Sequence, residues 1–136
     1  MQISKKGLYG LEAMLVLGKH CPERLMKIHE IASSEGIPEK FLELILLELK
    51  RARLVESERG AKGGYRLRRS PKRIFLGEII RTIDGPLAPF GDAESLRRLV
   101  ARDKKHRALF RLFLDVRNAA ARILDHTSLA DLAGDR

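Results

Sequence analysis

The sequence contains a single cysteine, Cys21, among its 136 residues, and it has no tryptophan. One cysteine cannot form a disulfide within the chain, and it cannot supply the several thiolates of a thiolate-only metal site. We interpret Cys21 as a small apolar residue by default, with redox sensing by an exposed thiol as the alternative. An internal disulfide and a thiolate-only metal site are therefore both excluded.

Long apolar runs and catalytic motifs are also missing. The richest apolar stretch, LELILLEL, is interrupted by Glu43 and Glu48 and is far shorter than the roughly 20 residues of a membrane helix. The first ten residues lack the apolar core and cleavage site of a signal peptide. No P-loop, dinucleotide-binding glycine pattern, HExxH or nucleophile elbow is present. We therefore expect a cytoplasmic protein that has no membrane partner and is not an enzyme.

Positive charge is abundant, and most of it lies in one region. The formal net charge is +9, and residues 50–73 contain ten lysines and arginines against two glutamates. Phosphate binding accounts for such a patch, because each cation that meets a phosphate releases condensed counterions. The charge therefore favours a nucleic acid partner, with a solvated basic surface as the alternative.

Helical periodicity predicts three helices before and within the basic region. The first is expected over residues 4–20, with Ser4 as a possible cap. A short helix over residues 27–34, a tight turn at Gly36 and a longer helix over residues 38–52 follow. Two helices joined by a short turn that contains glycine are typical of a helix-turn-helix.

The longer of these two helices has an apolar side and a polar side when its residues are spaced at 100°. Its apolar side is expected to face the core and consists of Phe41, Leu42, Ile45 and Leu49. The opposite side carries Glu39, Lys40 and Glu43 near the helix start, after Pro38, together with Leu47. Lys40 suits guanine or a phosphate, and Glu43 suits the amino group of cytosine. Interaction of Glu39 and Glu43 with the positive helix terminus is the alternative.

A basic hairpin directly follows this helix. Residues 54–58 and 64–69 are predicted to form two short strands, and Gly63 in the intervening loop lets the chain reverse without a Cβ clash. Arg59 on so slim a loop suits a narrow minor groove, whereas Lys62 suits phosphate. Helix, turn, helix and basic hairpin together predict a winged helix-turn-helix in which the hairpin is the wing. A plain surface hairpin with solvated side chains is the alternative.

A second apolar stripe lies near the carboxyl end, at alternating spacings of three and four residues. Its candidate dimerisation residues are Leu109, Leu112, Phe113, Val116, Ala119 and Ile123. Only about two heptads are present, so we expect packing against a second copy of the chain rather than an extended coiled coil. Packing within one chain is the alternative. An S-x-x-D box from Ser128 to Asp131 predicts a short terminal helix.

Four segments share their order and spacing with a known family. They are KKGLYGLEAMLVL, IPEKFLELILLELKRARLVESERGAKGGYRL, LGEIIRTIDGPLAP and TSLADL, and the match extends over nearly the whole chain. These segments resemble the Rrf2 family of bacterial winged-helix transcription regulators, which includes the iron–sulfur cluster regulators. The resemblance implies a homodimer on operator DNA, with Lys6 and Tyr9 near the DNA backbone, Glu43 as a base reader and Arg59 in the wing.

The chain departs from the cluster-binding members of that family before the long helix. Those members carry three cysteines in this segment, but this chain has none there, and His106 lies one place before the position of a ligand histidine in some members. An iron–sulfur cluster needs several thiolates or close substitutes. We therefore expect no iron–sulfur cluster and no other cofactor.

The expected fold is mainly α with a small β-wing. Residues 1–85 would form the winged DNA-binding domain, residues 86–102 a linker or effector segment, and residues 103–136 the dimerisation helix and a short terminal helix. The expected function is a sequence-specific regulator, in the form of a repressor, that acts as a homodimer on a pseudo-palindromic operator in double-stranded DNA. The alternative is a dimeric adaptor or sensor that uses its basic face for a protein or RNA partner.

Overall fold

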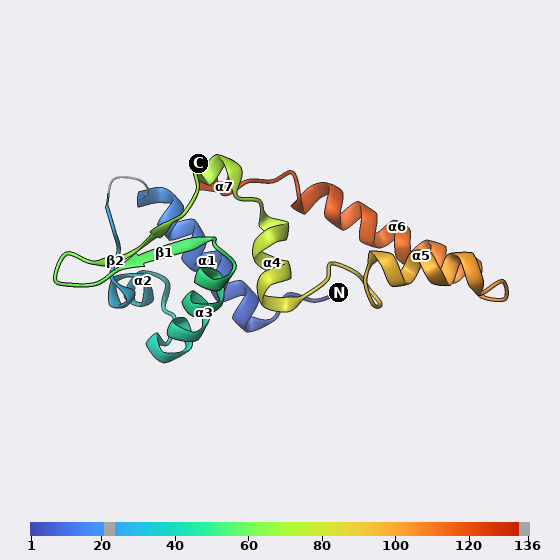
Figure 1. The fold of residues 1–136 in the computed structure, drawn as a ribbon, viewed down its shortest axis with the longest axis horizontal. Coiled ribbons are helices and arrows are strands. Elements are labelled where there is room, and N and C mark those ends of the chain that lie inside the picture. Colours follow the sequence, from blue (N-terminus) through green and yellow to red (C-terminus); the bar gives the residue numbers. More distant parts are fainter. Residues whose placement is uncertain (21–23, 134–136) are drawn as a thin grey trace.

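The structure, a computed structural model, describes residues 1–20 and 24–133. A winged domain forms one end of the molecule, and a helical hairpin projects from it (Figure 1). The winged domain consists of α1 (Lys5–His20), α2 (Ile28–Glu35), α3 (Glu39–Arg51), β1 (Val55–Glu58), β2 (Gly64–Leu67), the 3-10 turn η1 (Pro71–Arg73) and α4 (Leu76–Asp84). The hairpin consists of α5 (Ala93–Arg102) and α6 (Arg107–Leu124), and α7 (Leu129–Ala133) returns to pack against α1. The predicted fold, mainly α with a small β-wing, is confirmed.

The helix-turn-helix forms where the sequence predicts it. Ser4 caps α1, because the backbone N–H of Gly7 donates to its Oγ at 2.9 Å. Gly36 ends α2 in the left-handed conformation, with φ at 66°, which glycine adopts without a Cβ clash. Pro38 lies just before α3 in the cap position, so the helix begins at Glu39, one residue later than predicted.

The core of the winged domain is continuous and apolar. Leu42, Ile45 and Leu49 of α3 are fully buried, as predicted, and pack with residues of α1 and α4 such as Met14 and Ile79. Leu46 of α3 is fully buried as well. Burial of these four side chains contributes roughly 6 to 12 kcal/mol to folding before entropy costs. This burial fixes the position of α3, and it leaves the opposite side of that helix facing solvent.

The wing is a two-stranded antiparallel sheet. Val55 pairs with Leu67, and the register runs to Glu58 opposite Gly64 at the tip. The sheet is anchored to the segment before α2 by reciprocal hydrogen bonds between Met26 and Tyr65, with N···O distances of 2.9 and 2.7 Å. The wing therefore has a fixed direction relative to the helix-turn-helix.

Residues 93–102, within the segment predicted to be a linker or effector region, form a regular helix. Asp92 caps α5 by accepting from the backbone N–H of Ser95 at 2.8 Å, and these hydrogen bonds lower the pKa of the Asp92 carboxyl. α5 packs along α6 as an antiparallel hairpin, and the Arg107 side chain at the start of α6 donates to the Val100 carbonyl at 2.7 Å. This helix was not predicted from the sequence, although Leu96, Leu99 and Val100 follow helical spacing after the cap residue Asp92.

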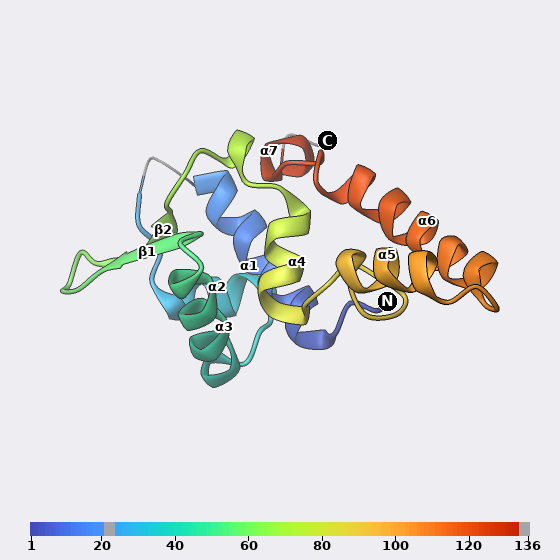
Figure 2. The ribbon, with the colours of Figure 1, turned by 45° about the vertical axis from the view of Figure 1, so that its right-hand side comes forward.

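The hairpin joins the winged domain through a junction at the end of α6. Arg81 of α4 and Asp125 form a bidentate ion pair, with N···O distances of 2.7 and 2.8 Å. The Leu76 N–H donates to the Thr127 carbonyl at 2.9 Å. Figure 2 shows that the wing and the hairpin consequently extend in opposite directions from this junction.

The predicted terminal helix is α7. Ser128 and Asp131 cap each other's backbone N–H groups at 2.8 and 3.1 Å, which is the capping box that the sequence indicated. Among residues 1–20 and 24–133, no helix combines the length and the apolar character that crossing a membrane requires.

Candidate nucleic-acid interface

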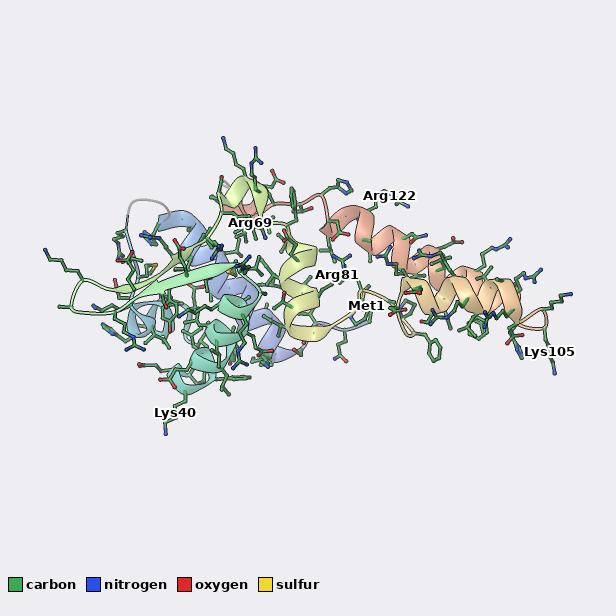
Figure 3. All side chains as sticks on the ribbon, in the orientation of Figure 1. Met1, Lys40, Arg69, Arg81, Lys105 and Arg122 are labelled. Atoms are coloured by element: carbon green, nitrogen blue, oxygen red, sulfur yellow. The ribbon has the colours of Figure 1, made fainter. Side chains whose placement is uncertain are left out.

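The start of α3 presents the predicted base-reading residues to solvent. Pro38, Glu39, Lys40 and Glu43 are all exposed. Lys40, at the start of α3, extends away from the rest of the domain (Figure 3). Because the buried side of α3 holds the helix against α1 and α4, this polar end is free to enter a groove of DNA.

The wing loop carries Arg59 and Lys62, and both are exposed. Gly63 is instead buried in the turn, where a Cβ would lie 2.2 Å from the Glu58 carbonyl oxygen. Gly63 therefore shapes the wing rather than presenting its backbone on the surface. The Lys27 ammonium donates to the Gly60 carbonyl at 3.3 Å and so holds the loop from the side of α2. Sequence reasoning missed Lys27, because only the folded wing places it there.

Charges on the wing strands are partly neutralised. Arg66 of β2 contacts Glu56 at 2.8 Å and Glu58 at 3.0 Å. The Arg66 hydrogen bond lowers the pKa of the Glu56 carboxyl, and Glu56 in turn raises the pKa of Arg66. Of the cations predicted to form a basic patch, Arg66 thus supports the strands, whereas Arg59 and Lys62 are displayed at the tip.

The two predicted contact residues of α1 have different surroundings. Lys6 is half-buried and forms an ion pair with Glu48 of α3. Tyr9 packs edge-on against Phe41, with ring centroids 5.5 Å apart, and the ammonium of Lys5 lies 5.4 Å from the centre of the Tyr9 ring. The exposed Lys5 was not singled out from the sequence. Because Lys6 is paired with Glu48, the exposed Lys5 beside Tyr9 is the better placed of these two lysines to meet a phosphate.

The candidate dimerisation residues form an exposed stripe on α6. Leu112 and Ile123 are 57% and 64% exposed, Leu109 and Val116 are also exposed, and Phe113 and Ala119 are half-buried. Ala121, the buried residue of α6, lies on a different side of the helix. The large exposed residues of the stripe are therefore left uncovered by the packing of α6 within the chain, whereas Phe113 and Ala119 are partly covered.

A helix-turn-helix with an exposed polar helix start and a basic wing defines the winged helix-turn-helix class of DNA-binding proteins. The family model described as "Iron-dependent Transcriptional regulator", Rrf2, matches residues 3–135. The chain belongs to the Rrf2 family.

Individual relatives agree with this assignment. The HTH-type transcriptional regulator CymR of Bacillus subtilis is 38% identical over 136 residues, which cover 98% of this chain and 90% of that protein. The solved structure of the same protein, described as the global cysteine regulator of that organism, superposes with a TM-score of 0.83 and covers 98% of this chain and 96% of that one. The oxidised form of CymR from Staphylococcus aureus is 34% identical, has a TM-score of 0.79 and covers 100% of this chain and 98% of that one. The chain is thus a DNA-binding transcriptional regulator and not an enzyme.

The family's description names iron, so we tested whether the residues of this chain fit an iron centre. The segment from Phe90 to Arg107 contains no cysteine. Among the described residues, no three histidine, cysteine, aspartate or glutamate side chains come together in a way that could hold a metal ion. His106 is engaged with Asp103, with its Nδ1 3.2 Å from a carboxylate oxygen. These residues do not fit an iron or iron–sulfur centre. Cys21, the candidate redox residue, lies outside the described residues.

Proposed function

We propose that the chain is a homodimeric repressor that binds a pseudo-palindromic operator in double-stranded DNA in the cytoplasm. The observation that carries this proposal is the apolar stripe of α6, which is exposed at the opposite end of the molecule from the wing. A regulator with one recognition helix per chain gains affinity and sequence length by pairing two of them about a two-fold axis.

A second copy of this chain is the partner that the α6 stripe suits. Leu109, Leu112, Val116 and Ile123 extend over about 21 Å of helix at 1.5 Å per residue. These four side chains are about half exposed, so completing their burial would contribute about 1 kcal/mol each. The stripe is self-complementary when two α6 helices cross, because each leucine then meets an equivalent apolar residue.

Five of the predicted contact residues receive a specific role in this proposal. Glu43 at the start of α3 meets a base edge in the major groove, and Lys40 meets a guanine or a phosphate. Arg59 at the wing tip enters the minor groove, where its guanidinium senses groove width, and Lys62 contacts phosphate. Tyr9, positioned by Phe41, faces the DNA backbone.

Residues 86–102 connect the DNA-binding and dimerising parts, and we assign the response to an effector to this segment. A cleft of about 420 Å³ lies between the end of α4, the start of α5 and α6, and Arg81, Arg97 and Arg117 are among its lining residues. Arg81 is already paired with Asp125, and Asp92 and Glu94 also line the cleft. Arg97 and Arg117 are therefore the guanidinium groups that suit an anionic effector. Occupation of this cleft would change the angle between hairpin and winged domain, and hence the separation of two recognition helices.

A footprint on genomic fragments tests the proposal. The protein should protect one site of two inverted half-sites, with centres one or more helical turns apart. Addition of the protein should lower transcription from a promoter that overlaps the site. Salt-sensitive binding without sequence preference would overturn the proposal and would favour the adaptor that uses its basic face for another partner.

A further inference from the structure

Two leucines occupy the centre of the outer side of α3. Leu44 and Leu47 are 58% and 43% exposed, whereas Leu42, Ile45, Leu46 and Leu49 have no exposed surface at all. At 100° per residue, the mean direction of the four buried residues is opposite to the mean direction of Leu44 and Leu47. The packing of the domain therefore does not explain why leucine stands at either position.

Cations stand at both ends of this leucine pair. Lys40, Leu44, Leu47 and Arg51 follow the spacing of one straight helical stripe, and Lys40 and Arg51 are exposed. The two cations are eleven residues apart, or about 16 Å along the helix axis. The stripe is thus apolar in its middle and positive at its ends.

The major groove of DNA has the complementary arrangement. Its phosphate ridges are anionic, the groove between them is about 12 Å wide and admits a helix, and the thymine methyl group is the apolar feature of its floor. A protein partner fits less well, because a stable interface buries about 800 Å² per partner and two leucines flanked by Lys40 and Glu43 provide only a small fraction of that.

We propose that Leu44 and Leu47 are specificity-determining residues that recognise the methyl groups of thymines in each operator half-site. This inference rests on the proposed function, since it requires α3 to lie in the major groove. Burial of a thymine methyl group against a leucine removes apolar surface of both from water. Replacement of thymine by uracil deletes only that methyl group and keeps the base-pairing edge intact.

The experiment uses the operator found by footprinting, in which thymines of the half-sites are replaced one at a time by deoxyuracil. At one or two positions per half-site, affinity should fall about fourfold, the factor that corresponds to one buried methyl-sized group. Substitution in both half-sites should multiply the losses to about fifteenfold for a dimer. Deoxyuracil outside the half-sites should have no effect.

Matched variants assign the effect to the leucines. Leu44→Ala or Leu47→Ala should bind the thymine operator more weakly and should no longer distinguish thymine from uracil at one position. Leu132→Ala in α7 replaces a leucine that is 44% exposed, much as Leu47 is, and it should keep the full discrimination.

The outcomes separate this inference from the function on which it rests. Equal affinity of the unaltered protein for the thymine and uracil operators would overturn the role of the leucines and leave the regulator intact. Variants that bind both operators more weakly by the same factor would also overturn it, because the leucines would then act on the fold of α3. Failure to bind any specific operator would instead refute the proposed function.

Discussion

The winged domain and the α5–α6 hairpin differ in how they bury their apolar residues. In the winged domain, side chains from α1, α2, α3 and α4 form one core, and many of them are completely buried. In the hairpin, Leu96 and Ala121 are the buried residues of α5 and α6, while the apolar stripe of α6 faces solvent. The same chain thus contains one part with its own interior and one part whose apolar face is exposed to solvent.

This difference separates the two tasks that a dimeric regulator must perform. The winged domain can present α3 and the wing in a fixed geometry, because its own core holds them. In the proposed dimer, the hairpin would set the distance between two such domains once a second chain covers α6. The ion pair between Arg81 and Asp125 joins the two parts.

The largest expected effect follows from removing the apolar stripe of the hairpin. Leu112→Glu with Val116→Glu should abolish the dimer and lower operator affinity more than about 100-fold, because two charges would be buried in the interface and the second half-site would be lost. Sedimentation and gel-shift titration measure these effects. The matched substitution Asn118→Glu, on the exposed polar side of α6, should leave both unchanged. A double variant that remains dimeric would show that the stripe is not the interface.

Substitutions in the wing test the contribution of the winged domain to DNA binding. Arg59→Ala should weaken operator binding by about 1 to 3 kcal/mol, more at sites with A·T-rich flanks, while the dimer stays intact. Lys62→Ala should weaken binding to all DNA alike and reduce the salt slope by roughly one. Gel-shift titrations at several salt concentrations distinguish the two. Operator binding by Arg59→Ala at the original affinity would contradict the assignment of the wing.

A change in the wing's backbone should damage the winged domain without touching the hairpin. At Gly64, φ is 143° and a Cβ would lie 2.5 Å from the Met26 carbonyl oxygen. Gly64→Ala should therefore lower the free energy of unfolding by roughly 2 kcal/mol through strain and steric clash. Gly60→Ala is the control, because φ is 103° there but a Cβ would meet nothing within 4 Å. Equal losses in a denaturant titration would contradict the steric part of this account.

The junction between the two parts should show the smallest effect. Hydrogen bonds from Arg81 lower the pKa of Asp125, so the ion pair stabilises the fold above the unfolded pKa of about 4 and this contribution is lost as the pH falls through the lower folded value. Asp125→Asn should cost about 1 kcal/mol at neutral pH, since both side chains are about one-third exposed. The difference from the unaltered protein should shrink in acid. A difference that is constant from pH 7 to pH 2 would contradict it.

The sequence predicted those elements whose signals are local. Ser4 at the start of α1, the glycine turn between α2 and α3, and the Ser128–Asp131 box each satisfy backbone groups within a few residues. Such interactions are visible in the order of residues alone. The wing was predicted for the same reason, because its strands and glycine-rich loop are adjacent in the chain.

Features that depend on distant residues were not predictable in this way. The pairing of Lys6 with Glu48 and the contact of Lys27 with the wing loop arise only when separate elements meet. Arg53 adopts a φ of 64° just after α3, a conformation that glycine usually adopts, so the residue type did not indicate this helix end. Leu47 was placed on the exposed side of α3 from the sequence, whereas the exposure of Leu44 was not predicted.

The mass of the protein–operator complex tests the central claim most directly. Light scattering or sedimentation of the protein with a duplex that contains both half-sites should give two chains per duplex, and a duplex with one half-site should bind at least about 100-fold more weakly. One chain per duplex, with equal affinity for the single and the paired half-sites, would contradict the account of a homodimer that reads a two-fold symmetric operator.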